Sequence, residues 1–454
     1  MEENFSLLLS QLDAWLEDHR QEMFRDIAGL VAIPSVGNPG ENGTPYGVAN
    51  TDAIRYMGAL ADRYGFAWQN HDWQCMSISY GSGDRQLGIW GHLDVFAVDP
   101  ADWQVTKPFE CVQVQNFLFG RGTQDNKGPD IGSLYLLRYL KEHHIVPPFE
   151  IRLIYGCCEE SAMTDVDAYL KMEKAPDLSF VPDCGFPVCY GEKGFLELTL
   201  RSKPMSSAVT RLSGGQAINA IPGKADAVIG GEAIHAEGIA GHSAYPEGTV
   251  NAFGILAEKC LTCPELSEED RKAFRFLADA GRDSYGKALG IDRADEPSGP
   301  MTCAPTLLSM EDGCMKVSVN IRYPITMHGD DIIRDFENAA AAYGMTMTVG
   351  RNTEPNHEDP KGAWAQFLTQ VFADVTGKRE EPYVMGGGTY ARRIPNAVGF
   401  GPGLPKDMSH LNLPEGHGEC HQSDESQCID TLFLAWKIYM CTVLRLIGQG
   451  LPLE

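Results

Sequence analysis

Apolar residues recur at two spacings in the first 190 residues of the chain, and the two spacings alternate. Apolar positions three or four residues apart predict helices, and short continuous apolar runs predict buried strands. The predicted helices cover residues 1–24, 50–65, 128–143 and 165–174, and the predicted strands cover residues 85–95, 149–160 and 178–186. The tetrapeptide TDVD, residues 164–167, fits a capping box for the last of these helices. The alternation predicts an α/β layer with a largely parallel sheet.

The pattern of the chain changes near residue 191. Alternating polar and apolar positions now predict amphipathic strands, with one clear helix and a polar, helix-rich region between them. These strands cover residues 194–204, 224–240, 315–325 and 345–352, and the helix covers residues 250–263. The first pattern returns near residue 354, with helices at 362–377 and 428–448 and a strand at 397–402. We therefore predict a mostly parallel α/β domain, residues 1–190 and 354–454, with an α+β domain, residues 191–353, inserted into it.

Composition narrows the possible partners of this chain. The net charge is -25, with 37 Lys and Arg against 62 Asp and Glu, which argues against a nucleic-acid partner. We recognise no apolar segment long enough to span a membrane, and the acidic, amphipathic first residues lack the positive start of a signal peptide. Thirteen cysteines without such a signal suggest reduced thiols. We expect a cytoplasmic protein.

The motif GHLDVF, residues 91–96, places a histidine and an aspartate at the end of a predicted buried strand. Side chains alternate faces along a strand, so His92 and Asp94 point the same way. An aspartate behind a histidine can orient a metal ligand. A buried histidine can equally well have a structural hydrogen-bond partner. The pair alone leaves both interpretations open.

Further acidic groups and a second histidine follow strands elsewhere in the predicted α/β part: Asp125, Glu159 with Glu160, Asp183 and His421. Ligands of open α/β sheets bind beyond the carboxyl ends of the strands, so these residues are predicted to meet there. Imidazole and carboxylate together suit zinc or manganese. One carboxylate can bridge two ions roughly 3.5–4 Å apart, and a spare one can act as general base. Singly, each residue is a weak signal.

Seven motifs in order give the chain a resemblance to a known family: GHLDV, GRGTQDNKGP, EES, PD, GHSAYPEG, GGGTYAR and CHQSDE. They closely resemble the co-catalytic zinc peptidases that include aminoacylases, carnosinases and glutamate carboxypeptidases, and most of all the bacterial PepV-type dipeptidases. The resemblance runs over nearly the whole chain. It implies that the α/β part is a zinc-exopeptidase catalytic domain and that the inserted α+β part is a lid.

The resemblance also implies two divalent metal ions, zinc or manganese. Each ion would have one histidine and one carboxylate of its own, and a third carboxylate would bridge them. The implied ligands are His92 and Asp183 for one ion, Glu160 and His421 for the other, and Asp125 for the bridge.

Two residues beside the ligands receive roles from the same resemblance. Asp94 would orient His92, and Glu159 would be the general base that takes a proton from the water attacking the peptide carbonyl. The family usually has an aspartate after the bridging one, whereas Asn126 stands here. The bridging role should nevertheless stay with Asp125. The matching Asp-Asp bond of the family implies a cis peptide bond between Asp125 and Asn126.

The resemblance assigns substrate binding to residues of the inserted domain and of a glycine loop. These are Asn219, His242, Arg322, Gly387, Gly388 and Thr389. Arg322 could instead be a surface arginine, and His242 could be structural. The glycine loop lacks the G-K-[ST] of a phosphate-binding loop, and the chain has no G-x-S-x-G elbow of a serine hydrolase.

Together these features predict a broad-specificity dipeptidase that acts on small peptides. The long inserted domain resembles that of monomeric PepV-type relatives, so we expect a monomer. Two alternatives remain open at this point. One is an N-acyl amino acid deacylase on the same scaffold, and the other is a catalytically inactive metal-binding protein.

Overall fold

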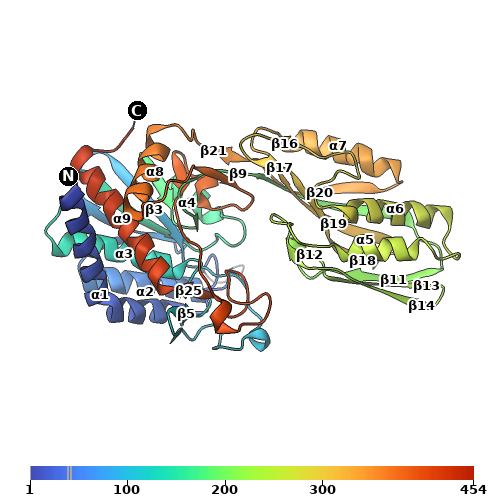
Figure 1. The fold of residues 1–454 in the computed structure, drawn as a ribbon, viewed down its shortest axis with the longest axis horizontal. Coiled ribbons are helices and arrows are strands. Elements are labelled where there is room, and N and C mark those ends of the chain that lie inside the picture. Colours follow the sequence, from blue (N-terminus) through green and yellow to red (C-terminus); the bar gives the residue numbers. More distant parts are fainter. Residues whose placement is uncertain (1, 38–39, 41–42, 454) are drawn as a thin grey trace. The chain divides into compact units, whose positions relative to one another are not determined.

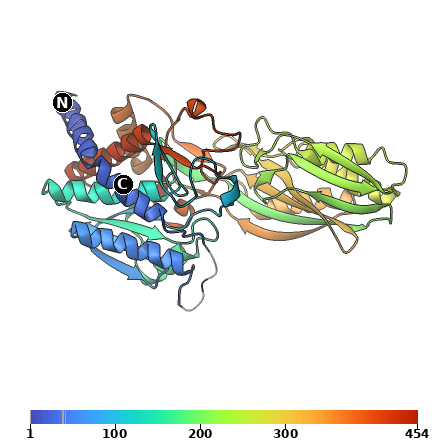
Figure 2. The ribbon, with the colours of Figure 1, turned by 90° about the horizontal axis from the view of Figure 1, so that it is seen from below.

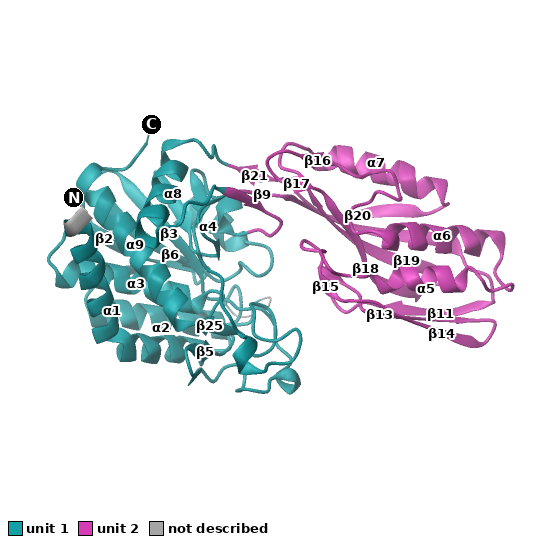
Figure 3. Cartoon of the chain, viewed as in Figure 1, with its two compact units in different colours: residues 1–190, 358–382, 389–454 teal, residues 191–357, 383–388 magenta. Residues whose placement is uncertain are grey.

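The computed structural model describes residues 2–37, 40 and 43–453 of the chain (Figure 1). The chain divides into two compact units (Figure 3). Unit 1 contains residues 1–190, 358–382 and 389–454, and unit 2 contains residues 191–357 and 383–388. The predicted division had its second boundary at 353/354 and left residues 383–388 in the α/β part. Residues 383–388 belong to unit 2, where the backbone N–H of Lys193 donates to the carbonyl oxygen of Met385.

A mixed sheet forms the middle of unit 1, with the strand order β1-β2-β6-β3-β7-β23-β9. The four strands β6, β3, β7 and β23 are parallel to their neighbours in this group. The other pairings along this path are antiparallel. The bounds are β1 (Ala67–His71), β2 (Cys75–Gly81), β6 (Glu150–Gly156), β3 (Gln86–His92), β7 (Leu178–Val181), β23 (Ala397–Gly399) and β9 (Cys189–Glu192). The predicted mostly parallel α/β layer is therefore confirmed for the central strands.

Helices cover both faces of the central strand β3. Trp90 packs with Val166 and Tyr169 of one helix, α4, while a Cβ atom on the next residue, Gly91, would meet Asp130 of another helix, α3. A strand buried on both faces reads as a continuous apolar run, as "LGIW" does. The helices of unit 1 are α1 (Glu2–Val31), α2 (Val48–Tyr64), α3 (Lys127–Glu142), α4 (Thr164–Met172), α8 (Ala363–Thr376) and α9 (Ile429–Gln449). Helices α1, α3 and α9 pack against one another (Figure 2).

Short elements near the loops of unit 1 complete it. A small sheet has the order β25-β5-β4, and β24 pairs with β8. The bounds are β4 (Val112–Val114), β5 (Phe117–Phe119), β25 (Ser426–Cys428), β8 (Cys184–Gly185), β24 (Pro402–Gly403), and the 3-10 helices η1 (Pro100–Asp102), η2 (Tyr390–Arg393) and η3 (Ser409–Leu411). All thirteen cysteines are free, in agreement with the expected reduced thiols.

Two details of the sequence analysis were wrong. Helix α4 has no capping box: its N-cap is Met163, in a left-handed conformation and without a side-chain hydrogen bond. The Asp165 carboxylate instead accepts from the backbone N–H groups of Cys157 and Cys158. In the described part of the chain, helix α9 is by length and composition apolar enough to cross a membrane, with a mean hydropathy of 1.4. More than half of that window, 56%, is buried inside the protein, so packing accounts for much of its apolar character.

Unit 2 is built on a seven-stranded antiparallel sheet with the order β14-β13-β11-β18-β19-β10-β20. Its core lies between the sheet and the helices α5, α6 and α7, as expected for an α+β unit. The bounds are β10 (Gly194–Pro204), β11 (Val209–Gly214), β13 (Lys224–Ile229), β14 (Glu232–Glu237), β18 (Thr302–Glu311), β19 (Cys314–Tyr323), β20 (Thr346–Thr353), α5 (Ala252–Cys260), α6 (Glu268–Arg282) and α7 (Gly329–Ala342). The shorter strands are β12 (Ala220–Ile221), β15 (Gly241–His242), β16 (Ala294–Asp295), β17 (Gly299–Pro300), β21 (Asn356–His357) and β22 (Tyr383–Met385).

Candidate metal centre

The carboxyl ends of three neighbouring parallel strands in unit 1 bring the predicted polar groups together. His92 is the last residue of β3, Glu159 and Glu160 follow β6, and Asp183 follows β7. Parallel strands end at the same edge of a sheet, so the loops that follow them converge. Asp125 precedes α3, and His421 precedes β25.

Five of these side chains form two groups that could each hold a metal ion. One group contains His92, Asp125 and Asp183, the other contains Asp125, Glu160 and His421, and the ligand atoms within each group lie within 4.8 Å of one another. Asp125 belongs to both. Its Oδ1 is 2.9 Å from His92 Nε2, and its Oδ2 is 3.0 Å from His421 Nε2. One carboxylate thus faces a histidine with each of its oxygens.

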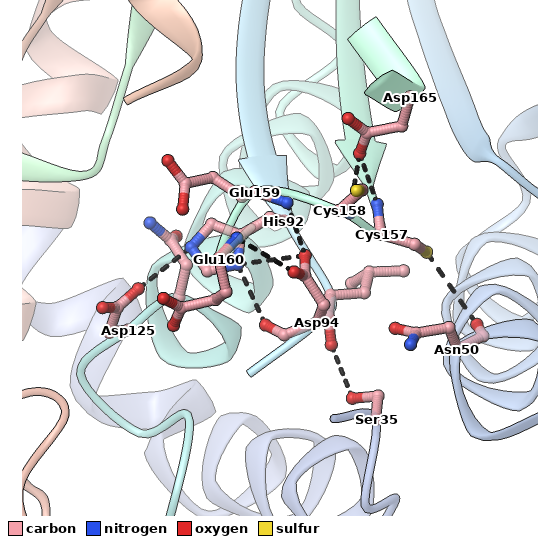
Figure 4. A network of polar contacts seen from close by, with 12 residues as sticks. Ser35, Asn50, His92, Asp94, Asp125, Cys157, Cys158, Glu159, Glu160 and Asp165 are labelled. Carbon is pink, nitrogen blue, oxygen red and sulfur yellow. Dashed lines mark hydrogen bonds and ion pairs between the residues drawn. The ribbon is translucent and has the colours of Figure 1, made fainter. Parts of the chain in front are cut away.

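Asp94 lies beneath both groups and is completely buried. The Nδ1 atom of His92 is 2.9 Å from the carbonyl oxygen of Asp94 and 3.5 Å from its carboxylate. The same carboxylate accepts from the backbone N–H groups of Glu159 at 3.1 Å and Glu160 at 3.0 Å (Figure 4). Asp94 therefore lies beside the His92 ring and also fixes the turn that carries the two glutamates.

The two glutamates differ in what their carboxylates contact. Glu160 Oε2 lies 3.0 Å from His421 Nε2. Glu159 is 8% exposed, and its buried Oε1 has no hydrogen-bond partner in the described part of the chain. Burial, followed by the negative charge of Asp183, raises the pKa of Glu159 well above its usual range. The Glu159 carboxyl group is therefore not part of a solvent-exposed turn.

The pKa values in the cluster indicate a lack of positive charge. Burial, together with the Asp125 carboxylate, raises the pKa of Asp183 to about 8. Burial would lower the pKa of His421, but hydrogen bonds to Asp125 and Glu160 raise it to about 11. The pKa values of a histidine and of a carboxyl group are thus both raised, because several carboxylates lie close together and favour the protonated form of their neighbours. Divalent cations would supply the same positive charge, and imidazole with carboxylate is a donor set that suits zinc or manganese.

The segment that carries Asp125 has the predicted backbone, since the peptide bond between Asp125 and Asn126 is cis. The Nδ2 group of Asn126 donates to the carbonyl oxygen of Pro182 at 2.9 Å, which ties this segment to the residue before Asp183. An ionised aspartate could not donate this hydrogen bond. Asn126, the departure from the family pattern, therefore links two ligand-bearing segments.

Sequence reasoning missed two residues that contact ligands or their backbone. The Phe96 ring stacks on the His421 ring, with the centroids 4.4 Å apart and the planes 12° apart. Glu425 accepts a hydrogen bond from the backbone N–H of Asp125. Phe96 belongs to the motif GHLDVF and Glu425 to CHQSDE, so proximity in sequence to His92 and His421 was an available signal.

The predicted substrate-binding residues Asn219, His242 and Arg322 all belong to unit 2. Strand β12, which begins right after Asn219, pairs with β15, which ends at His242. His242 is exposed, and Arg322, on β19, is only 8% exposed, which excludes the surface-arginine interpretation.

Arg322 is fixed by neutral groups of unit 2. It donates to Asn320 Oδ1 at 3.2 Å and to the carbonyl oxygen of Gly386 at 3.0 Å, and its guanidinium lies 4.1 Å from the centre of the Phe195 ring. The predicted Gly387 and Gly388 follow this carbonyl in unit 2. The predicted Thr389 lies in unit 1, where its hydroxyl accepts from the backbone N–H of Ala391 as the N-cap of η2.

Comparison with known proteins identifies the family to which this chain is similar. Residues 88–445 match peptidase family M20/M25/M40. The Bacillus subtilis protein named "Putative dipeptidase YtjP" is 28% identical over 470 residues, covering 94% of this chain and 97% of that protein. The solved dipeptidase Dug1p of Saccharomyces cerevisiae has a TM-score of 0.61 at 13% identity, covering 98% and 99% of the two chains. Bacillus subtilis YXEP, described as a dinuclear metal binding peptidase from the M20 family, has a TM-score of 0.54 at 10% identity, covering 95% and 99%.

The family match covers most of the chain and includes all five residues of the two ligand groups. It confirms the resemblance stated from the motifs, and the two structural neighbours confirm the fold class. The chain therefore belongs to peptidase family M20/M25/M40 and is a hydrolase of peptide bonds.

Proposed function

We propose that this protein is a broad-specificity dipeptidase that works with two divalent metal ions. The observation that carries the proposal is the pair of ligand groups that share Asp125. Relatives named as dipeptidases and a structural neighbour described as binding a dinuclear metal support it. The ions would be zinc or manganese, held by His92, Asp125, Glu160, Asp183 and His421.

Two divalent cations in these positions would polarise the peptide carbonyl and acidify the attacking water. The chain's own groups then have separate tasks. Glu159 takes the proton of that water and passes it to the leaving amine. Its burial supports this role, because burial raises the pKa of the Glu159 carboxyl group and so favours its acceptance of a proton. The Asp94 carboxylate holds the backbone of Glu159 in place.

The residues of unit 2 would bind the substrate. Arg322 would hold the substrate carboxylate, since a planar guanidinium matches a carboxylate with two parallel hydrogen bonds. Its fixation by Asn320 and Gly386 supports this role, because a held side chain loses little freedom on binding. His242 would stabilise the developing oxyanion. Asn219 and the loop Gly387, Gly388 and Thr389 would position the peptide.

A cytoplasmic, monomeric enzyme is also part of the proposal. The reduced cysteines support the compartment. Light scattering of the purified protein tests the monomer, and a stable dimer would contradict it.

The substrate class is tested with metal-stripped protein to which zinc, manganese or cobalt is added back. A panel of dipeptides is compared with N-acetyl amino acids that carry the same side chains. Faster hydrolysis of the dipeptides supports the proposal. Faster hydrolysis of the N-acetyl compounds would make the protein a deacylase, and no hydrolysis of either would make it an inactive metal-binding protein.

A further inference from the structure

Glu425 is completely buried, and it accepts hydrogen bonds from four donors in a segment some 300 positions away in the sequence. Its Oε1 accepts from three backbone N–H groups, those of Gly122 at 3.0 Å, Gln124 at 2.9 Å and Asp125 at 3.1 Å. Its Oε2 accepts from the Arg121 guanidinium. One carboxylate therefore holds the whole turn that ends at Asp125.

The backbone around Glu425 reinforces this connection. Its own carbonyl oxygen accepts from the N–H of Gly120 at 3.0 Å. The next residue, Ser426, starts strand β25 and is paired with Phe119 at the end of β5. The segment before Asp125 and the segment after His421 are thus joined along their length, by strand pairing and then by the Glu425 side chain.

This connection matters because Asp125 and His421 belong to one ligand group. Asp125 Oδ2 lies 3.0 Å from His421 Nε2. The backbone N–H of Asp125 is held by Glu425, and His421 is only four residues before Glu425 in the chain. Displacement of Glu425 would therefore move both ligands relative to each other.

We propose that Glu425 is a positioning residue that sets the geometry of the ligand group formed by Asp125, Glu160 and His421. The inference rests on the proposed two-metal function. Three backbone N–H groups donate to one oxygen of Glu425, and hydrogen bonds to a carboxylate are about twice as strong as those between neutral groups. In Glu425→Gln, the amide N–H groups would also face the N–H groups of the Arg121 guanidinium, so two hydrogen-bond donors would meet without an acceptor. The turn before Asp125 then loses its fixed position while the ligands themselves remain.

The preceding residue offers a matched control. Asp424 is also completely buried and also accepts several hydrogen bonds, from the backbone N–H groups of Gln104 and Val105 and from His417. None of these three donors is in the segment before Asp125. Asp424→Asn should therefore loosen the protein locally without moving the ligand group.

The test is calorimetric titration of metal-stripped protein with zinc alone, for the wild type, Glu425→Gln and Asp424→Asn. Circular dichroism at the same temperature verifies that each protein is folded. We expect the wild type to bind two ions. We expect Glu425→Gln to weaken at least one of the two affinities by about 10–100-fold, as for other groups that orient metal ligands. Asp424→Asn should keep both affinities and lose only thermal stability. If Glu425→Gln does not fold, Glu425→Asp is measured in its place.

The possible failures can be told apart. A wild type that binds fewer than two ions overturns the proposed function, and this inference with it. A wild type that binds two ions, with unchanged affinities in folded Glu425→Gln, overturns the inference alone. Equal weakening in Asp424→Asn and Glu425→Gln also overturns it, because general loosening of the loop would then explain the loss.

Discussion

Glu159 and Glu160 in unit 1 and Asp270 in unit 2 carry carboxylates with very different surroundings. In unit 2, Asp270 is completely buried and accepts from the backbone N–H and hydroxyl of Ser206 and from the backbone N–H of Ser267. In unit 1, Glu159 and Glu160 each have a buried oxygen, Oε1, without a hydrogen-bond partner in the described residues. Burying a carboxylate oxygen without a hydrogen-bond partner does not stabilise a protein.

The difference separates a structural carboxylate from a functional one. Asp270 completes the capping box of α6 with Ser267 and also accepts from Ser206, so both of its carboxylate oxygens have partners. The carboxylates of the unit 1 cluster face one another and two histidines, and such perturbed groups gather where a protein binds ions or moves protons. Each prediction below contrasts these two environments or the buried charges of the two units.

The largest effect is expected for Glu159→Gln. The amide keeps the shape of the side chain but cannot accept a proton, so turnover of a dipeptide should fall by about 10²–10⁴-fold. Both metal ions should remain, as measured by elemental analysis of the purified variant. Asp270→Asn is the control and should keep its turnover. Loss of an ion from Glu159→Gln would show that Glu159 is a ligand instead of the base.

Glu160→Ala should affect metal content instead. Glu160 Oε2 lies beside His421 Nε2, and its removal takes one of three ligand residues from one group only. We expect the bound metal to fall from two ions per chain to one after dialysis, with a matching loss of turnover. Glu173→Ala is a control on a glutamate outside the site. If Glu160→Ala retained two tightly bound ions, the assignment of Glu160 would be wrong.

A smaller effect is expected for the buried cation of unit 2. Arg322→Lys keeps the charge but loses the planar fork, so KM for a dipeptide should rise by about tenfold, equivalent to ~1.4 kcal/mol. Arg351 stacks on the same Phe195 ring, and Arg351→Lys is the matched control. Metal content should not change in either variant. Equal KM values for the two variants would contradict the proposal that Arg322 binds the substrate carboxylate.

A separate effect concerns the pH dependence of stability. Asp130 in unit 1 is fully buried, neither carboxylate oxygen has a partner in the described residues, and burial followed by nearby charges raises its pKa well above the usual range. In the unfolded chain the Asp130 carboxyl group releases its proton above about pH 3.9, whereas in the folded protein it keeps the proton to a higher pH. The free energy of unfolding therefore falls as the pH rises. The free energy of unfolding of Asp130→Asn should therefore rise relative to that of the wild type by up to ~1.4 kcal/mol for each pH unit above about 3.9.

For Asp270 in unit 2, we expect the opposite change of stability with pH. Burial would raise its pKa, but hydrogen bonds from Ser206 and Ser267 lower it below the usual value. Its contribution is therefore present at neutral pH and lost as pH falls, so Asp270→Asn should be less damaging in acid. Urea unfolding of metal-stripped protein at pH 3, pH 5 and pH 7 measures both variants. A gain for Asp130→Asn that does not grow with pH would show that Asp130 is ionised in the folded protein.

Much of the fold follows from local patterns in the sequence. The alternation of helical and strand spacing predicted the central parallel strands, and the apolar run before His92 predicted a strand covered on both faces. The convergence of His92, Glu160 and Asp183 followed from one rule about the ends of parallel strands. These features depend on residues close together in the chain or on a general property of sheets.

Other features depend on contacts that local patterns do not contain. TDVD did not become a capping box because helix α4 already begins at Thr164, whose hydroxyl lies 2.9 Å from the Tyr46 hydroxyl. Residues 383–388 joined unit 2 because the backbone N–H of Lys193 in unit 2 donates to the carbonyl oxygen of Met385. The sequence did not predict a role for Glu425 in CHQSDE, since its donors precede it by some 300 residues. Tertiary hydrogen bonds decided all three.

The central claim is that the two ligand groups sharing Asp125 hold two divalent ions that the reaction requires. The most direct measurement is zinc titration of metal-stripped protein, with hydrolysis of one dipeptide followed at each added equivalent. We predict two bound ions per chain and full hydrolysis only when both are present. One ion per chain at saturation, or full hydrolysis by the stripped protein, would contradict the claim.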